Sequence, residues 1–317
     1  MNTLVDLCTG AGALWLHALG GRQLLPPVSW MGGKRRLAGD VFAALGLVDR
    51  RELTRIVMVD AGPWGWVWPA VLGEHGPRVC ALLRAWGQDK GARELWDWLS
   101  EQPPMAGPAE KAAQWLWLQA RSASGVPVWW STGQEAGWRT SANRHRGYDQ
   151  VAQQTGGAWC ACSGGGTPTR VGCRGPSGGM VRPSTISRRI EAIRSAVTKW
   201  GGIVDIIHGD VRDIDPVPGA YVTFDPNYQG RTGYGWNCPR PLVLEVSRRW
   251  ANAGCRVATC EAAPLDIAGW HHLELAPGRK NPEWLTLNHA PVRVPPQQCP
   301  LYFDGRSPHE LVQVGGL

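Results

Sequence analysis

Short apolar runs alternate with helix-like stretches in the two outer parts of the chain. Runs bounded by glycine, proline or acidic residues predict strands at 3–7, 56–59, 203–207, 220–224, 256–260 and 284–288. Helical patterns follow at 13–19, up to about residue 72 after the second strand, and at 241–253. Strands that alternate with helices are typical of a mainly parallel sheet, so the pattern predicts an α/β fold.

The middle of the chain breaks this alternation. Helical patterns at 110–121 and 184–200 flank a polar region rich in Gly, Ser and Arg, and glycine is densest from 156 to 179. Long segments of this composition are usually functional or disordered loops. We therefore predict one α/β domain made of residues 1–99 and 196–295, an inserted, mainly helical and loop-rich recognition lobe at 100–195, and a C-terminal tail at 296–317.

The charge of the chain indicates an anionic partner. The net charge is +7 with a pI near 9.1, and arginines gather between positions 121 and 194, where acidic residues are few. Such a surface suits phosphates, although an ordinary solvated basic face has the same composition. The arginines expected to face the partner are Arg121, Arg139, Arg144, Arg146 and Arg182.

Other features of the composition favour a cytoplasmic protein with a packed core. No apolar run is long enough to span a membrane, and the N-terminus lacks the features of a secretory signal. The nine cysteines are an odd number without regular spacing, which favours reduced thiols. The tryptophans of apolar stretches, such as Trp64, Trp66 and Trp68, are expected in the core.

Acidic residues end or follow the predicted strands. They are Asp6, Asp60, Asp210 and Asp225. Because ligands of open α/β sheets bind at the carboxyl ends of the strands, these acids are expected to line one crevice. Asp6, just before the glycine turn that contains Gly10 and Gly12, suits a cationic amine, and Asp60 suits ribose hydroxyls, as in sites for adenosine cofactors. Glycine also serves tight strand-to-helix turns that bind nothing.

A second glycine-containing turn runs from Trp30 through Gly33 to Lys34. Its spacing is not that of a phosphate loop. A lysine after two glycines suits a carboxylate that approaches bare backbone. We therefore expect Lys34 to meet a ligand carboxylate, with an exposed basic turn as the alternative.

The most specific motif is Asp225-Pro226-Asn227-Tyr228 at the end of an apolar strand. It resembles the Asp-Pro-Pro-Tyr motif of DNA amino-methyltransferases, in particular the adenine-N6 branch that contains the Dam-like and phage-borne enzymes. The turn from Trp30 to Lys34 resembles that family's Trp-x-Gly-Gly-Lys motif, and the turn from Asp6 to Gly12 resembles its cofactor loop. Asp210 resembles the acid that holds the cofactor's adenine, and 112–121 resembles the helix that opens the recognition lobe.

The resemblance covers most of the chain and implies a Rossmann-like sheet that binds S-adenosylmethionine. It implies methyl transfer to the exocyclic amino group of a base in double-stranded DNA, with adenine N6 as the target. Asp225 and the carbonyl of Pro226 would accept the two amino hydrogens and direct the nitrogen lone pair at the methyl group, beside Asn227, while Tyr228 stacks on the flipped base. No metal is expected. The residues expected to bind the cofactor are Asp6, Gly10, Gly12, Trp30, Gly33, Lys34, Asp60 and Asp210.

Two features depart from the family pattern. Asn227 replaces the second proline and adds a side-chain amide beside the target, and the cofactor loop precedes the lysine motif, which is the reverse of the Dam-like order. The alternatives are therefore an enzyme that acts on cytosine N4 or on RNA, transfer of a larger group from a modified cofactor, and a catalytically silent nucleic-acid-binding homologue.

Histidines and cysteines offer one candidate metal cluster. It comprises Cys160, Cys162, Cys173 and His145. A one-residue gap and the lack of a second cysteine pair argue against zinc. The remaining candidates, His208, His271 and His272, have no matching cluster and are expected at the surface or in satisfied polar positions.

Overall fold

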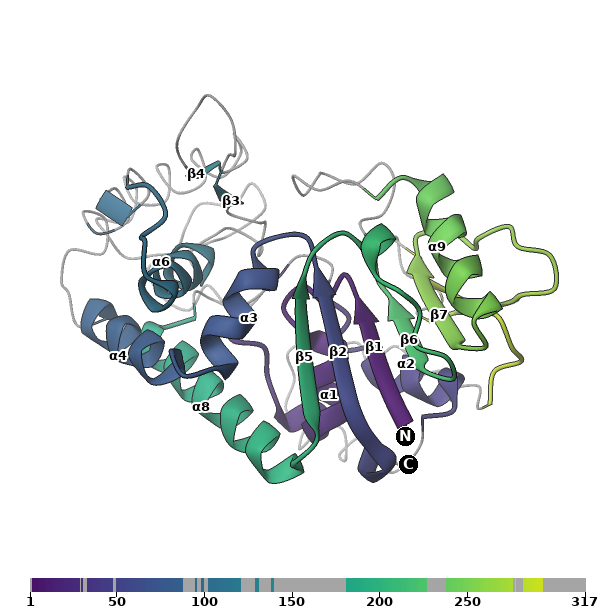
Figure 1. Cartoon of the computed structure of the whole chain (residues 1–317), viewed down its shortest axis with the longest axis horizontal. Helices are drawn as coiled ribbons and strands as arrows, with labels where there is room; N and C mark the ends of the chain where they lie inside the picture. Colours follow the sequence, from purple (N-terminus) through teal and green to yellow (C-terminus); the bar gives the residue numbers. More distant parts are fainter. Residues whose placement is uncertain are drawn as a thin grey trace, which may run out of the picture.

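The computed structural model describes residues 2–28, 30, 33–47, 50–87, 95, 98–99, 102–120, 129–130, 138–139, 181–226, 238–275, 277 and 282–292. A seven-stranded sheet has the order β5-β2-β1-β6-β7-β9-β8 (Figure 1). Its strands are β1 (Asn2–Leu7), β2 (Leu53–Asp60), β5 (Ile203–His208), β6 (Tyr221–Phe224), β7 (Arg256–Glu261), β8 (His271–Glu274) and β9 (Trp284–Leu287). All neighbouring pairs from β5 to β7 are parallel, whereas β9 is antiparallel to both β7 and β8. The fold is the Rossmann-like α/β fold that the sequence predicts.

Helices cover both faces of the sheet because the chain winds in two directions from its centre. From β1 the chain proceeds to β2 and β5 on one side, and from β6 to β7 on the other. Right-handed crossovers in opposite directions place their helices on opposite faces. One face carries α1 (Ala13–Gly20), α2 (Ala38–Leu45), α3 (Trp64–Leu72), α4 (Gly76–Gly87), α6 (Pro108–Ala120) and α8 (Pro183–Trp200), and the other carries α9 (Arg240–Asn252). The direction of winding therefore changes between β1 and β6.

Two of these helices come from the segment that the sequence assigns to the recognition lobe. In the structure α6 contacts α3 and α4, and α8 contacts α1, α3 and α4. Their buried residues belong to the same apolar core as Leu4 and Ile56 of the sheet. The described ends of the predicted lobe are thus part of the body that surrounds the sheet.

Most of the predicted lobe between α6 and α8 lies outside the described residues. Only the backbone of a two-stranded antiparallel ladder is described there, β3 (Trp129–Trp130) with β4 (Trp138–Arg139). Within this segment, the predictions that fall outside the described residues are those for Arg121, Arg144, Arg146, His145, Cys160, Cys162 and Cys173. The tail at 296–317 also lies outside them.

Tryptophans fill the core on the helix-rich face. Trp64 and Trp68 are fully buried and stack with ring centroids 5.2 Å apart, and Trp115 meets Trp64 edge-on at 5.0 Å. Trp66 is partly buried and packs against the same core under Lys111. The core role predicted for these tryptophans is confirmed. No described helix is both long and apolar enough to cross a membrane.

Candidate functional site at the carboxyl edge of the sheet

The centre of the sheet brings two acids together where the winding direction changes. β1 and β6 are neighbours, with Leu7 opposite Phe224. Asp6 lies in β1, and Asp225 follows β6 directly, with its backbone N–H 3.4 Å from the carbonyl oxygen of Leu7. In open α/β sheets such a switch point opens a crevice at the carboxyl ends of the strands. The predicted convergence of acids at this edge therefore holds for Asp6 and Asp225.

The turn after β1 is held in a conformation that needs glycine. Cys8, Gly10 and Gly12 have positive φ angles of 61°, 52° and 79°. A Cβ atom on Gly10 would lie 3.1 Å from Nε1 of Trp30, and one on Gly12 would lie 2.3 Å from Nε1 of Trp15. Backbone conformation and close packing therefore both require glycine at positions 10 and 12. The first of these contacts also shows that the two predicted glycine turns meet.

Asp60 ties this turn to the end of β2. Its Oδ2 accepts a hydrogen bond from the Gly10 N–H and its Oδ1 accepts one from the Gly62 N–H, both at 2.8 Å. Burial raises the pKa of Asp60, and these two hydrogen bonds oppose the shift. Each carboxylate oxygen accepts more than one hydrogen bond. Asp60 can therefore hold the turn and still receive a hydroxyl donor, as its predicted ribose contact requires.

Asp6 carries a carboxylate oxygen that lacks a donor. The residue is 1% exposed, and its Oδ1 accepts the Thr223 hydroxyl at 2.9 Å. Within the described part of the chain, Oδ2 has no hydrogen-bond partner. Burial raises the pKa of Asp6 well above its ordinary value, the Thr223 hydrogen bond opposes this, and the nearby Asp225 charge adds to it. A cationic donor at Oδ2 would relieve both the missing hydrogen bond and the buried negative charge.

Lys34 is buried at this edge of the sheet, where it pairs with protein carboxylates. It is 2% exposed, and its Nζ lies 2.7 Å from Oδ1 of Asp225 and 3.5 Å from Oε2 of Glu283. Burial lowers the pKa of Lys34, but the charge and hydrogen bond of Asp225, together with contributions from Cys260 and Glu283, raise it by more in total, so the net shift is upward. The alternative of an exposed basic turn is wrong for Lys34. A ligand carboxylate as a further partner of this ammonium group stays a prediction.

Glu283 and Glu261 are site residues that the sequence analysis missed. Glu283 precedes β9, and because β9 is antiparallel, its first residues lie at the carboxyl edge of the parallel strands. Glu261 ends β7, is 3% exposed, and accepts the Ala262 N–H at 3.2 Å. Burial raises the pKa of Glu261 to about 7. The position of Glu261 at the end of a strand could have identified it, but the strand predicted at 256–260 stops one residue before it.

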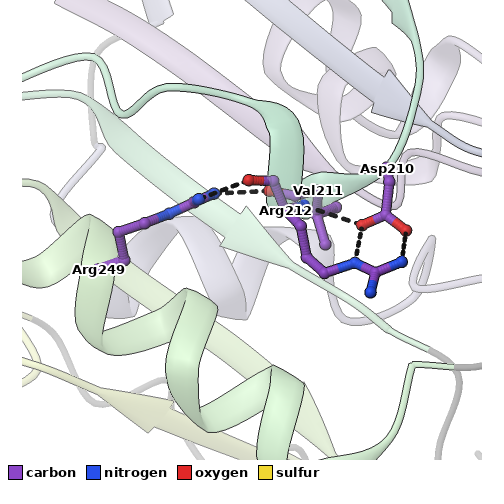
Figure 2. A network of polar contacts seen from close by, with 4 residues as sticks. All are labelled: Asp210, Val211, Arg212 and Arg249. Carbon is purple, nitrogen blue, oxygen red and sulfur yellow. Dashed lines mark hydrogen bonds and ion pairs between the residues drawn. The ribbon is translucent and has the colours of Figure 1, made fainter.

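The carboxylate of Asp210 accepts hydrogen bonds from Arg212, two residues later in the chain (Figure 2). Arg212 donates from Nε to Oδ1 at 3.0 Å, from a terminal nitrogen to Oδ2 at 2.8 Å, and from its backbone N–H to Oδ1 at 2.9 Å. The Arg212 hydrogen bonds lower the pKa of Asp210. Arg249 of α9 donates to the carbonyl oxygens of Val211 and Arg212 and fixes this turn. Asp210 thus lies at the predicted edge, but an adenine amino group would share its carboxylate with Arg212.

The structure describes the remaining predicted site residues to different extents. Trp30 packs against Trp64 at a centroid distance of 5.7 Å, and Gly33 is exposed. Pro226 is buried next to Asp225, whereas Asn227 and Tyr228 lie outside the described residues. Arg182 is exposed at the N-cap of α8, and of Arg139 only the backbone is described.

Metal-ligating side chains do not gather in the described part of the chain. No group of three or more His, Cys, Asp or Glu residues there has the arrangement of a metal site. The three histidines His208, His271 and His272 are exposed, as expected. The carboxylates of the crevice are instead spread along the strand ends.

Comparison with known proteins gives a weak structural likeness. No family model matches the chain, and no curated protein matches it. Among solved structures, the rRNA methyltransferase aviRa from Streptomyces viridochromogenes is 15% identical, with 90% of this chain and 76% of that chain covered and a TM-score of 0.32. A TM-score this low carries no conclusion about the present chain.

Proposed function

We propose that this protein is an S-adenosylmethionine-dependent methyltransferase that modifies the exocyclic amino group of a base in DNA, with adenine N6 as the target. The observation that carries the proposal is the meeting of three predicted motifs at the switch point of the sheet. Asp225 and Pro226 follow β6, Lys34 pairs with Asp225 at 2.7 Å, and the glycine turn after Asp6 lies beside them.

The charge of the crevice fits the proposed cofactor. The described acids at this edge are Asp6, Asp60, Asp210, Asp225, Glu261 and Glu283, against the cations Lys34, which is buried, and Arg212, which pairs with Asp210. An excess of carboxylates favours a ligand with cationic groups, and S-adenosylmethionine carries a sulfonium and an ammonium. Oδ2 of Asp6 would receive the ammonium, because it is buried and lacks a donor among the described residues. Asp60 would receive the ribose hydroxyls.

The residues of the site suit activation of an aromatic amine. Such an amine is a poor nucleophile while its lone pair is conjugated with the ring. Asp225 and the carbonyl of Pro226 would accept its two hydrogens and turn the lone pair out of the ring plane. Lys34 pairs with the Asp225 carboxylate and fixes the direction in which it accepts. S-adenosylmethionine, when bound, supplies the methyl group from a positively charged sulfur.

DNA as the substrate rests on the Asp-Pro-Asn-Tyr motif and on the basic charge of the chain. An amino group in a duplex is buried in the base stack, so the nucleotide has to be flipped into the crevice. The excess of arginine between positions 121 and 194 would supply phosphate contacts that hold the opened duplex.

The test is to incubate the protein with methyl-labelled S-adenosylmethionine and either genomic duplex DNA or total RNA, and then to identify the labelled nucleoside by mass spectrometry. Label in N6-methyladenine of DNA is expected, and Asp225→Ala is expected to abolish it. Label in N4-methylcytosine or in RNA would overturn the target, and a nucleoside heavier than the methyl product would indicate transfer of a larger group. Cofactor binding without any labelled product would overturn the assignment as an enzyme.

A further inference from the structure

The turn that carries Lys34 into the site also carries two arginines outward. Arg35 and Arg36 follow Lys34 directly and are exposed, whereas Lys34 is buried on Asp225. α2 begins two residues after Arg36. The basic pair is therefore attached to the rim of the crevice, within two residues of the group that contacts the proposed catalytic carboxylate.

Helix α8 brings more positive charge to the same rim. Arg189 donates to the carbonyl oxygens of Pro26 and Pro27 at 3.1 and 3.3 Å, which fixes the segment leading into the Lys34 turn against α8. Burial lowers the pKa of Arg189, and the nearby charges of Arg35 and Arg188 lower it further. Arg188 itself is exposed. Two segments far apart in the sequence thus place arginines close together at one edge.

These arginines lack carboxylate partners, unlike their neighbours. Throughout the described residues, no ion pair includes Arg35, Arg36, Arg188 or Arg189. Elsewhere on α8, Glu191 forms an ion pair with Arg84 of the neighbouring helix α4. Like charges gathered without counterions repel one another and favour an anionic partner. Repeated phosphates of a nucleic-acid strand match several separate guanidinium groups better than one small anion does.

We propose that Arg35, Arg36 and Arg188 form a phosphate-binding rim that holds the DNA backbone beside the flipped nucleotide, with Arg189 as the residue that positions the turn. The proposal rests on the proposed function. Flipping a nucleotide out of the duplex displaces the neighbouring phosphates, and cations at the rim stabilise the displaced DNA backbone. Because Lys34 and Arg35 are adjacent, DNA bound at the rim lies next to the site of chemistry.

The experiment compares Arg35→Gln, Arg36→Gln and Arg188→Gln with Lys199→Gln. Lys199 is exposed near the other end of α8, so its change removes the same charge from the same helix away from the rim. The affinity for a fluorescein-labelled 30-base-pair duplex is measured by anisotropy at several KCl concentrations, and the affinity for S-adenosylmethionine is measured by calorimetry. Each rim variant is expected to weaken DNA binding severalfold and to flatten the slope of log affinity against log salt by about 0.9. Lys199→Gln is expected to keep the wild-type slope, and all four variants the wild-type cofactor affinity.

The outcomes separate the rim from the proposed function. Rim variants with the wild-type slope, or a control variant with the same loss as the rim variants, would overturn the rim. Tighter binding of an RNA duplex, with the same loss in the rim variants, would overturn DNA as the partner, and binding of an acidic protein in place of either nucleic acid would overturn a phosphate rim. Loss of cofactor affinity in the rim variants would assign the turn to the cofactor site. A wild-type protein that binds the duplex but never methylates it would leave the rim standing and overturn only the proposed enzyme.

Discussion

Removing the ammonium group of Lys34 is expected to destabilise the protein in a way that depends on pH. Lys34→Met keeps the length of the side chain but leaves two carboxylates, Asp225 and Glu283, without their cation. Both carboxylates are about four-fifths buried, with exposures of 18% and 22%. Water therefore cannot replace the ammonium group fully, and the variant should also lose turnover because Asp225 is no longer held.

The size of the effect follows from the distances. At an effective dielectric constant near 20, unit charges 2.7 Å apart attract by about 6 kcal/mol, and charges 3.5 Å apart by about 5 kcal/mol. The cost of burying Lys34 cancels much of this attraction, and removing one partner of a buried pair usually costs about 3 to 5 kcal/mol. Because the two carboxylates retain some contact with water, we expect a loss of about 3 kcal/mol in the free energy of unfolding at pH 8.

The dependence on pH identifies the cause. Without Lys34, its ammonium group no longer balances the negative charges of two carboxylates that are about four-fifths buried. The cost of those charges is larger at a pH that keeps them ionised, so the loss of stability should be smaller at pH 5 than at pH 8. Urea unfolding at the two pH values measures it. In a double-mutant cycle, Asp225→Asn should remove about half of the effect of Lys34→Met, because Glu283 supplies the other part of the attraction.

Two results would refute this reasoning. A loss of stability that is equal at pH 5 and pH 8 would mean that Lys34 contributes packing and not charge. Additive effects of Lys34→Met and Asp225→Asn would mean that the two side chains do not interact in solution. The affinity for S-adenosylmethionine is a separate measurement. It is expected to fall by about 1 to 3 kcal/mol, because Lys34 is predicted to form a charged hydrogen bond with the cofactor's carboxylate, and an unchanged affinity would remove Lys34 from the cofactor site.

Three further changes test the roles of individual carboxylates. Asp225→Ala should abolish turnover while the cofactor affinity measured by calorimetry stays within a few fold, and an equal loss of both would contradict its assignment to the target amine. The pKa of Asp6 is raised, and its carboxyl group must ionise to receive an ammonium. Cofactor binding should therefore release protons and strengthen as pH rises. Calorimetry in buffers of different ionisation enthalpy should show this proton release for the wild type and not for Asp6→Asn. The pKa of Glu261 is raised to about 7, so between about pH 4.5 and pH 7 the wild type should lose stability relative to Glu261→Gln, by on the order of 3 kcal/mol in total. Parallel stability profiles of the two proteins would show that Glu261 is not shifted.

The sequence predicted the parallel part of the sheet well because each strand is a short apolar run that ends at a polar residue. β8 was missed because its four residues begin with two exposed histidines and lack an apolar run. α2 and α4 were missed because only the first helix after each strand was predicted, and each of these two is a second helix that follows α1 or α3 in the same connection. The assignment of α6 and α8 to the lobe followed from composition, but their apolar faces pack on α3 and α4, and only the tertiary structure reports that contact.

The candidate site was predictable where its residues end strands and unpredictable where partners come from distant segments. Asp6 and Asp225 follow directly from the strand-end rule. The partners of Lys34 do not, because Glu283 reaches the site only through the antiparallel direction of β9. Arg212 as the partner of Asp210 is local, but an arginine two residues after an acid has no pattern that marks it as a bidentate partner.

The order of the two glycine turns along the chain matters less than what fixes them in space. Here the cofactor-type turn comes first, yet the space beside Gly10 is filled by Trp30 of the second turn, and Lys34 of that turn reaches Asp225 after β6. The segment leading into the second turn is held by Arg189, which bonds to Pro26 across 163 positions of sequence. Helix α8 therefore helps to set the position of the site's buried cation, and the order of the two turns along the chain does not by itself decide whether they meet.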